Sequence, residues 1–212
     1  MKRFGTVIIV LCILMVTLTG CAKIIKTGTE AELTGEKSFE ETLDVSNFWN
    51  SQTVPEIREK AVDLKDFLNE AAGDMRSLSG KYGKETAGAT NSVSFAVHGT
   101  GTITEVFTEK KAGYIVVDLD GYEGPEKIMV QIGSVIKKTS IRDYLSFIDV
   151  NDYADQIQFA ELSKQINAYV LENVIAGNDI ENALGKQVEF YGCFTYDKAD
   201  ELLITPVIME VK

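Results

Sequence analysis

The sequence predicts an α+β domain in which a small antiparallel β-barrel is accompanied by helices. Three observations lead to this fold class. Apolar residues alternate with period two in three neighbouring segments between residues 93 and 136, and again in two segments between 186 and 211. Helical spacing of apolar residues precedes the first group of strands and separates the two groups. A small β-sandwich with helices on one side is the alternative.

The N-terminus is typical of a secreted protein. Lys2 and Arg3 precede an apolar stretch from Phe4 to Leu18, which is shorter than the roughly 20 residues of a membrane-spanning helix. The sequence Leu-Thr-Gly-Cys that ends at Cys21 resembles the lipobox of bacterial lipoproteins. That resemblance implies removal of a signal peptide, residues 1–20, and a diacylglyceryl group, with acyl chains such as palmitate, on the thiol of Cys21. An ordinary secreted protein and an uncleaved anchor are the alternatives.

Two acyl chains anchor a protein stably in a bilayer, whereas one chain binds only marginally. Residues 21–45 are rich in Thr, Gly, Glu and Lys and show no period, so they are predicted to form a flexible tether. Phe48 and Trp49 follow, and two adjacent large aromatic residues indicate the start of a folded core. A single domain is therefore expected over residues 46–212.

The first helix is expected from Thr53 to Met75. Thr53 and Glu56 have the spacing of a capping box, and Pro55 suits the first helical turn. One apolar stripe runs along this segment, through Ile57, Ala61, Leu64, Leu68, Ala71 and Met75. The polar face is slightly acidic, which favours packing on a protein core over binding to a membrane surface.

Three strands are expected next, over residues 93–107, 114–121 and 127–136, joined by short turns as an antiparallel meander. The sequence His-Gly-Thr-Gly at 98–101 interrupts the alternation in the first of them and predicts a bulge or a sharp bend there.

Two helices and two more strands complete the chain. Ser140 and Asp143 are predicted to cap a helix over 141–148, and a second helix is expected over 159–174. Strands follow at 186–196 and 202–211, and Pro206 places the last one at an edge or a bulge. Three strands, a helical insertion and two strands, with a bend in the first strand, resemble an OB-fold, a five-stranded Greek-key barrel.

Composition excludes several classes of function. The formal net charge of −11 disfavours binding of nucleic acid. His98 is the only histidine, so a metal site built from several histidines is excluded, and no cofactor motif is present. After lipidation of Cys21 and removal of the signal peptide, Cys193 is the only free thiol, and no intramolecular disulfide is expected. Cys193 is interpreted as a packed core residue.

Several segments resemble an uncharacterised family of predicted bacterial periplasmic lipoproteins, a domain-of-unknown-function family. The segments are FWNSQTVPEIREKAVDLKDFL, VQIGSVIKKTSIRDYLSFI, NDYADQIQFAELSKQIN, LGKQVEFYGCF and ITPVIMEV. This chain has Lys138 where the family commonly has Gly, and Asp155 where it usually has Asn. The resemblance implies an accessory role near a sugar ABC transporter and supplies no catalytic residues.

A polar cluster lies between the apolar elements of that region. The candidate ligand-binding residues in it are Gln131, Arg142, Asp143 and Gln156, with Thr139, Ser140, Asp155 and Gln158 as neighbours. Fixed donors and acceptors of this kind suit the hydroxyl groups of a sugar. The alternative is structural: Ser140 and Asp143 cap a helix while Arg142 pairs with an acid.

Two functions follow from the sequence. The first is a non-catalytic, lipid-anchored binding or accessory module outside the cytoplasm, at the periplasm or cell surface, whose partners are the bilayer, a transporter component or a small polar solute. The second is an extracytoplasmic hydrolase of glycans or peptides that uses paired acids such as Asp118 and Asp143. Asp118, Asp120 and Glu123 only superficially resemble a calcium loop, because Asp120-Gly121 is explained by a turn.

Overall fold

The computed structural model describes residues 44–86 and 92–212. The predicted signal peptide, Cys21 and the predicted tether as far as residue 43 lie outside the described residues. The predicted end of the tether at residue 45 needs a correction. Asp44 caps helix α4 (Val45–Phe48) by accepting a hydrogen bond from the Ser46 N–H, and the side chain of Val45 is buried in the core.

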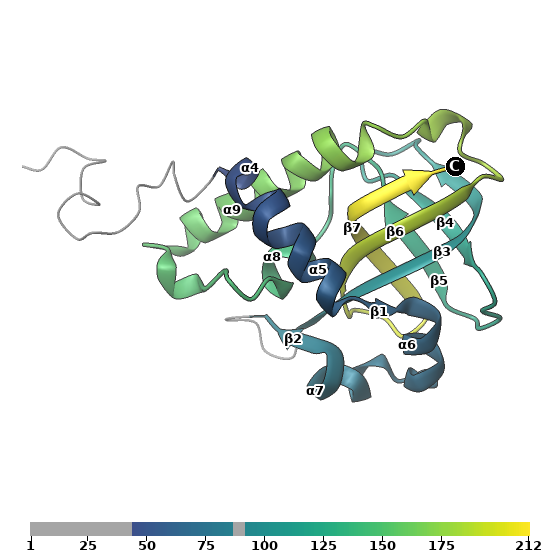
Figure 1. Ribbon diagram of the computed structural model, residues 1–212, viewed down its shortest axis with the longest axis horizontal. Helices are drawn as coiled ribbons and strands as arrows, with labels where there is room; N and C mark the ends of the chain where they lie inside the picture. The colour runs from purple at the N-terminus through teal and green to yellow at the C-terminus, as the bar shows by residue number, and fades with distance from the viewer. Residues whose placement is uncertain (1–43, 87–91) are drawn as a thin grey trace, which may run out of the picture. The chain divides into compact units, whose positions relative to one another are not determined.

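Five strands form the barrel: β3 (Val93–Phe107), β4 (Tyr114–Leu119), β5 (Lys127–Gln131), β6 (Gln187–Thr195) and β7 (Glu201–Val211). They are hydrogen-bonded in the order β3-β4-β5-β7-β6, and the pairing of β6 with β3 closes the ring (Figure 1). Four of the five barrel pairs are antiparallel, as expected for this fold class, and the β5–β7 pair, which joins segments distant in sequence, is parallel. A closed ring of pairings is a barrel and not the two separate sheets of a sandwich.

Strand β3 is continuous through residues 98–101, where a bulge or sharp bend was predicted. Its first part pairs with β6 and its last part with β4, and the bulge lies between Ile103 and Glu105, after the glycines. Gly101 serves another purpose. A Cβ atom there would lie 2.2 Å from the backbone oxygen of Asp118, so only glycine allows β3 and β4 to approach at the point where β3 changes partners.

The predicted bulge at Pro206 is confirmed. Pro206 pairs with Gly192, and the register between β6 and β7 shifts between Tyr191 and Gly192. Proline lacks an N–H donor, and a bulge is a position within a sheet where that loss is tolerated.

The predicted helix from Thr53 to Met75 is in fact several elements. A π-helix, η1 (Trp49–Thr53), leads into α5 (Val54–Lys60), after which the chain extends at Ala61. Strand β1 (Val62–Asp63) then pairs in parallel with β3, and Asp63 caps α6 (Leu64–Ala71) by accepting from the Asp66 N–H. The helical spacing of apolar residues continues past Asp63, but the chain is extended there because β1 pairs with β3.

The capping box predicted at Thr53 is also absent. The Thr53 side chain makes no cap hydrogen bond and its hydroxyl is buried without a partner among the described residues. The Glu56 carboxylate instead accepts from Lys60 and from the Ser146 N–H. Although burial raises the pKa of Glu56, these hydrogen bonds outweigh it and hold the pKa below its usual value.

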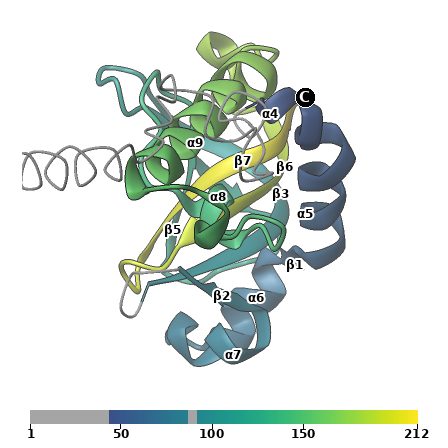
Figure 2. The ribbon, with the colours of Figure 1, turned by 90° about the vertical axis from the view of Figure 1, so that its left-hand side faces the viewer.

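The remaining elements lie around the barrel. Three short ones follow α6: η2 (Met75–Leu78), α7 (Ser79–Tyr82) and β2 (Gly83–Glu85), which pairs with β3. Between β5 and β6 come α8 (Ser140–Tyr144), η3 (Val150–Asp152), α9 (Gln156–Tyr169), the π-helix η4 (Val170–Ile175) and η5 (Ile180–Asn182). Figure 2 shows α8 between α5 and α9 on one side of the barrel, with α6 and α7 below.

Aromatic packing joins the helices to the barrel. Phe67 on α6 contacts Phe95 on β3 and Phe194 on β6, with ring centroids 5.1 and 5.9 Å apart. Trp49, which is 3 % exposed, packs on Tyr169 of α9 with centroids 4.8 Å apart. Each such ring contributes about 2 to 3 kcal/mol by its burial.

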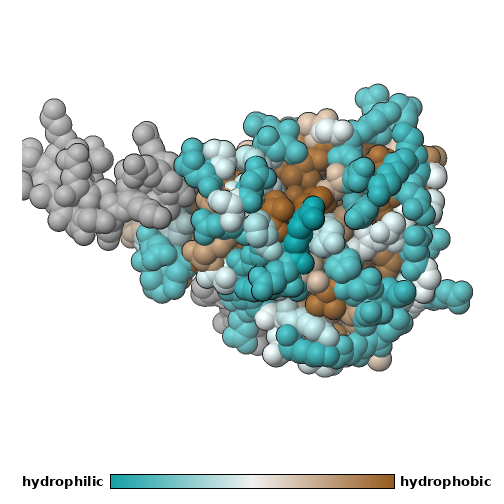
Figure 3. Space-filling view, viewed as in Figure 1, coloured by the Kyte–Doolittle hydropathy of each residue, from teal (hydrophilic) through white to brown (hydrophobic). Residues whose placement is uncertain are grey.

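The surface is largely polar. The face in Figure 3 is mostly hydrophilic, with hydrophobic residues visible in the recesses between polar side chains. Within residues 44–86 and 92–212, every helix is too short or too polar to cross a bilayer.

Candidate ligand-binding site

A cleft of about 390 Å³ lies against the edge of the barrel at strands β4, β5 and β7. Two connections border it, residues 108–113 between β3 and β4 and residues 196–200 between β6 and β7, together with the segment after β5. The lining residues are Ala112, Gly113, Tyr114, Met129, Gln131, Lys137, Lys138, Thr195, Asp197, Lys198, Glu201 and Leu203.

Side chains point alternately to the core and away from it along each strand, and those that point away form the floor of the cleft. Ile115, Val130 and Ile204 are fully buried in the core, and their neighbours Tyr114, Met129 and Leu203 line the cleft. Met129 and Leu203 face each other across the parallel β5–β7 pair. One aromatic ring and two aliphatic side chains therefore form an apolar floor.

Tyr114 is held in place by a second aromatic ring. Phe107 on the adjoining strand stacks on it with centroids 5.3 Å apart and an interplanar angle of 3°. Phe107 is 37 % exposed, and the Lys127 ammonium lies 5.7 Å from the Tyr114 centroid. The stack presents a rigid aromatic surface at low conformational cost.

Gln131 lies at this cleft, but its polar atoms are used within the fold. Its amide nitrogen donates to the Lys137 carbonyl at 3.0 Å and to Thr205 Oγ1 at 2.8 Å, and its oxygen accepts from the Lys137 N–H at 2.7 Å. The side chain is 2 % exposed. Gln131 therefore fixes the cleft wall after β5.

Charged side chains form the rim. The Lys138 ammonium lies 3.1 Å from the Asp197 carboxylate, which joins the segment before α8 to the β6–β7 connection. Lys198 pairs with Glu201 at 2.7 Å. Lys137 is the third cation, so lysines outnumber carboxylates in the lining by three to two.

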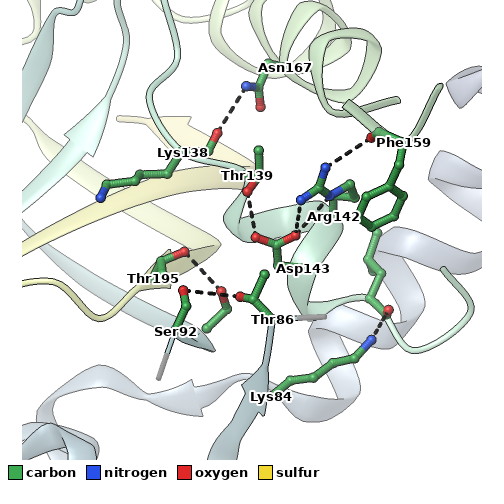
Figure 4. A network of polar contacts seen from close by, with 12 residues as sticks. Lys84, Thr86, Ser92, Lys138, Thr139, Arg142, Asp143, Phe159, Asn167 and Thr195 are labelled. Carbon is green, nitrogen blue, oxygen red and sulfur yellow. Dashed lines mark hydrogen bonds and ion pairs between the residues drawn. The ribbon is translucent and has the colours of Figure 1, made fainter. Parts of the chain in front are cut away.

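Arg142 and Asp143 form a separate, buried cluster (Figure 4). Asp143 Oδ1 accepts from Arg142 Nε at 2.9 Å and Nη2 at 2.6 Å, and Oδ2 accepts from Thr139 Oγ1 at 2.6 Å. Arg142 also donates to the Phe159 carbonyl at 3.0 Å, and its guanidinium lies 3.8 Å from the centroid of that ring. The two side chains are only 10 % and 4 % exposed.

This cluster lines a smaller cavity of about 210 Å³ together with Lys84. The Lys84 ammonium donates to the Leu145 carbonyl, and burial lowers the pKa of Lys84. Both oxygens of Asp143 and all three nitrogens of Arg142 already have protein partners. The cluster therefore holds α8 against α9 more readily than it could bind a polar ligand.

The predicted helix cap at Ser140 was wrong. The N-cap residue of α8 is Thr139, and its side chain bonds Asp143 instead of a backbone N–H. Ser140 is buried, and its hydroxyl donates to the Cys193 carbonyl at 3.0 Å. The same hydroxyl oxygen lies 3.1 Å from Thr205 Oγ1. The structural interpretation of Arg142 as the partner of an acid describes the geometry correctly.

The structure does not bring the four candidate ligand-binding residues together. Gln131 lines the cleft of about 390 Å³, Arg142 and Asp143 line the cavity of about 210 Å³, and Gln156 is exposed at the first turn of α9. Asp155 caps α9 by accepting from the Gln158 N–H at 2.8 Å.

The other candidate residues do not share a site either. Asp118 is exposed on β4, and the cavity lined by Asp143 does not include it. His98 stacks on Tyr191 with centroids 4.9 Å apart. Cys193 is fully buried, as predicted, and burial raises the pKa of its thiol well above the usual value. In the part of the chain that the structure describes, no three His, Cys, Asp or Glu residues cluster as metal ligands.

Most cleft residues were missed by sequence reasoning. Tyr114, Met129 and Leu203 are single outward positions on three strands, and nothing local distinguishes them. The available signal was topological, because OB-folds bind ligands beside the first and last of their strand connections. These correspond to residues 108–113 and 196–200.

Comparisons with known proteins agree with this architecture. A family model described as "Predicted periplasmic lipoprotein (DUF2291)" matches residues 11–210. The crystal structure of an OB-fold protein from Thermotoga maritima is similar, with a TM-score of 0.56, 18 % sequence identity, and coverage of 90 % of this chain and 100 % of that chain. The predicted OB-fold is thereby confirmed. No curated protein matches the chain.

Proposed function

Because the chain belongs to the family of predicted periplasmic lipoproteins of unknown function, we propose that it is a non-catalytic binding module that holds a small polar solute in the cleft beside β4, β5 and β7. Family membership confirms the extracytoplasmic, membrane-anchored localisation expected from the N-terminus. The proposed lipid on Cys21 would hold the domain at the membrane surface.

The observation that carries this proposal is the composition of the cleft. Its volume of about 390 Å³ lies in the range of small-molecule sites. Its floor combines the Tyr114 ring with Met129 and Leu203, and its rim supplies ammonium, carboxylate and hydroxyl groups. A sugar ring has apolar faces and a polar edge, so an aromatic floor with a polar rim suits it. The position is also the one at which OB-folds bind oligosaccharides.

The ion pairs and hydrogen bonds of the acidic residues support a non-catalytic role. Asp197 and Glu201 are each paired with a lysine at the rim. Asp143 is hydrogen-bonded through both oxygens and is nearly buried. A hydrolase of glycans or peptides that works through Asp118 and Asp143 is the alternative function, and it requires the two carboxylates to flank one substrate.

We propose a transporter component as the protein partner on the family resemblance alone. A membrane-anchored domain that binds a solute could serve a sugar transporter in the same membrane. Recovery of a transporter subunit with the lipidated protein from solubilised membranes would support that partnership, and repeated recovery of none would contradict it.

The experiment for the cleft is thermal unfolding of residues 44–212 against a panel of neutral and acidic sugars. A ligand that binds only the folded state raises the melting temperature by mass action. Leu203→Trp fills the floor and should abolish the shift. Leu184→Trp is the matched control, because Leu184 is 64 % exposed and lies outside the cleft lining. Absence of a shift with every sugar, or an equal shift in Leu203→Trp, would contradict the proposal.

A further inference from the structure

Lys138 has an unusual backbone conformation. Only two non-glycine residues in the described part of the chain have positive φ, Ala72 at 47° and Lys138 at 70°. A side chain in this left-handed region is crowded by its own backbone. Strain of this kind persists only where surrounding contacts fix it, and it is concentrated at functional sites.

The contacts of the fold hold Lys138 in this conformation. Its carbonyl accepts from Asn167 Nδ2 of α9 at 3.3 Å. On the preceding residue, the Lys137 N–H donates to the buried Gln131 side chain at 2.7 Å. The turn is thus fixed from β5 and from α9, and it directs the Lys138 ammonium to the cleft rim.

At Ala72 the same left-handed conformation has a structural role. It is the C-cap residue of α6, and its N–H donates to the Leu68 carbonyl. A left-handed residue commonly ends a helix in this manner. Lys138 ends no helix, and a glycine would make the same turn without strain. What a glycine could not supply is the ammonium group.

We propose that Lys138 determines the specificity of the cleft, which takes a sugar-sized solute carrying a carboxylate. This inference rests on the proposed function. Asp197 already places a carboxylate 3.1 Å from the Lys138 ammonium, and it marks the position of the ligand carboxylate that would replace it. The two side chains are 46 % and 64 % exposed, so a solute can reach both.

The charge of the lining agrees with an anionic ligand. Three lysines face two carboxylates in this cleft, although the chain as a whole has a formal net charge of −11. A local excess of positive charge in an acidic protein attracts an anion to this position. The aromatic and aliphatic floor would contact the remaining, uncharged part of a sugar-sized solute.

The test compares binding of glucuronate and glucose to residues 44–212 by titration calorimetry. The unaltered protein should bind glucuronate more tightly than glucose. Lys138→Gly should weaken glucuronate binding about fivefold, the scale of one half-exposed ion pair. Asp197→Asn should strengthen it, because the competing carboxylate is removed. Glucose has no carboxylate, so its affinity should fall by a smaller factor than that of glucuronate in Lys138→Gly, and it should gain no affinity in Asp197→Asn.

Ala72→Gly is the matched control, since it relieves the other left-handed residue without altering the cleft. It should leave both affinities unchanged, and Lys138→Gly should melt no lower than the unaltered protein. Equal binding of the two sugars, or unchanged glucuronate binding in Lys138→Gly, would overturn the role of Lys138 while leaving the cleft in place. If neither sugar binds, the proposed function fails for these sugars and the inference fails with it.

Discussion

The buried pair of Arg142 and Asp143 gives a quantitative prediction about stability. Substitution Asp143→Ala removes three hydrogen bonds, of 2.9, 2.6 and 2.6 Å, and leaves the Arg142 guanidinium without its acid. Both side chains are almost fully enclosed, so solvent screening offers little compensation. Removing one partner of a buried ion pair costs about 3 to 5 kcal/mol. We expect Asp143→Ala to lower the free energy of unfolding by that amount.

Urea unfolding of residues 44–212 measures this change. Asp118→Ala is the control, because Asp118 is exposed on β4 and its loss should change stability by no more than about 0.5 kcal/mol. The double variant Arg142→Met/Asp143→Ala should recover part of the loss, since it leaves no unpaired buried charge. A loss below about 1 kcal/mol in Asp143→Ala, or a double variant no more stable than the single one, would refute this reasoning.

Three further predictions concern other parts of the chain. Burial raises the pKa of Tyr144 to about 12, so the folded state keeps a proton that the unfolded state releases near pH 10. Stability should therefore fall between about pH 10 and 12 by roughly 2 kcal/mol, and Tyr144→Phe should flatten that fall in pH-dependent urea unfolding. Gly101→Ala should destabilise the barrel by about 2 to 4 kcal/mol in the same assay, because its Cβ would meet the Asp118 carbonyl; normal stability would refute the close approach. Cys21→Ser should move the full-length protein from the membrane to the soluble extracytoplasmic fraction, and intact mass spectrometry should show that the diacylglyceryl group is missing.

The barrel strands were predictable because their alternation is local. Val93, Ile115, Ile128, Val188 and Ile204 are all buried in the core, as the period of two indicated. Their order also indicated the OB-fold, since the helices that interrupt the series of barrel strands lie between the third and the fourth of them. The parallel β5–β7 pair could not be read from period alone, because it joins segments that are distant in sequence.

The first helix shows where local patterns fail. Ile57, Leu64 and Leu68 keep helical spacing and are all buried, yet the chain is extended between Ala61 and Asp63. Pairing of β1 with β3 causes this break, and that contact is tertiary. Asp63 offered a local hint, because Asp followed three residues later by Asp66 is a pattern of a helix start.

The candidate site was the least predictable part. Gln131 lines the cleft, but its side chain supports the wall through hydrogen bonds within the fold. The cleft brings Tyr114, Met129 and Leu203 together only through strand pairing. Sequence proximity had grouped Arg142 with Gln131, whereas the structure separates them into two cavities.

The central claim is that the cleft beside β4, β5 and β7 holds the ligand. Backbone-amide NMR of residues 44–212 during a titration with glucuronate tests it most directly. We predict that the largest shift changes fall on Tyr114, Lys138, Asp197 and Leu203. Changes centred instead on Lys84, Arg142 and Phe159, or spread evenly over the barrel, would contradict the claim.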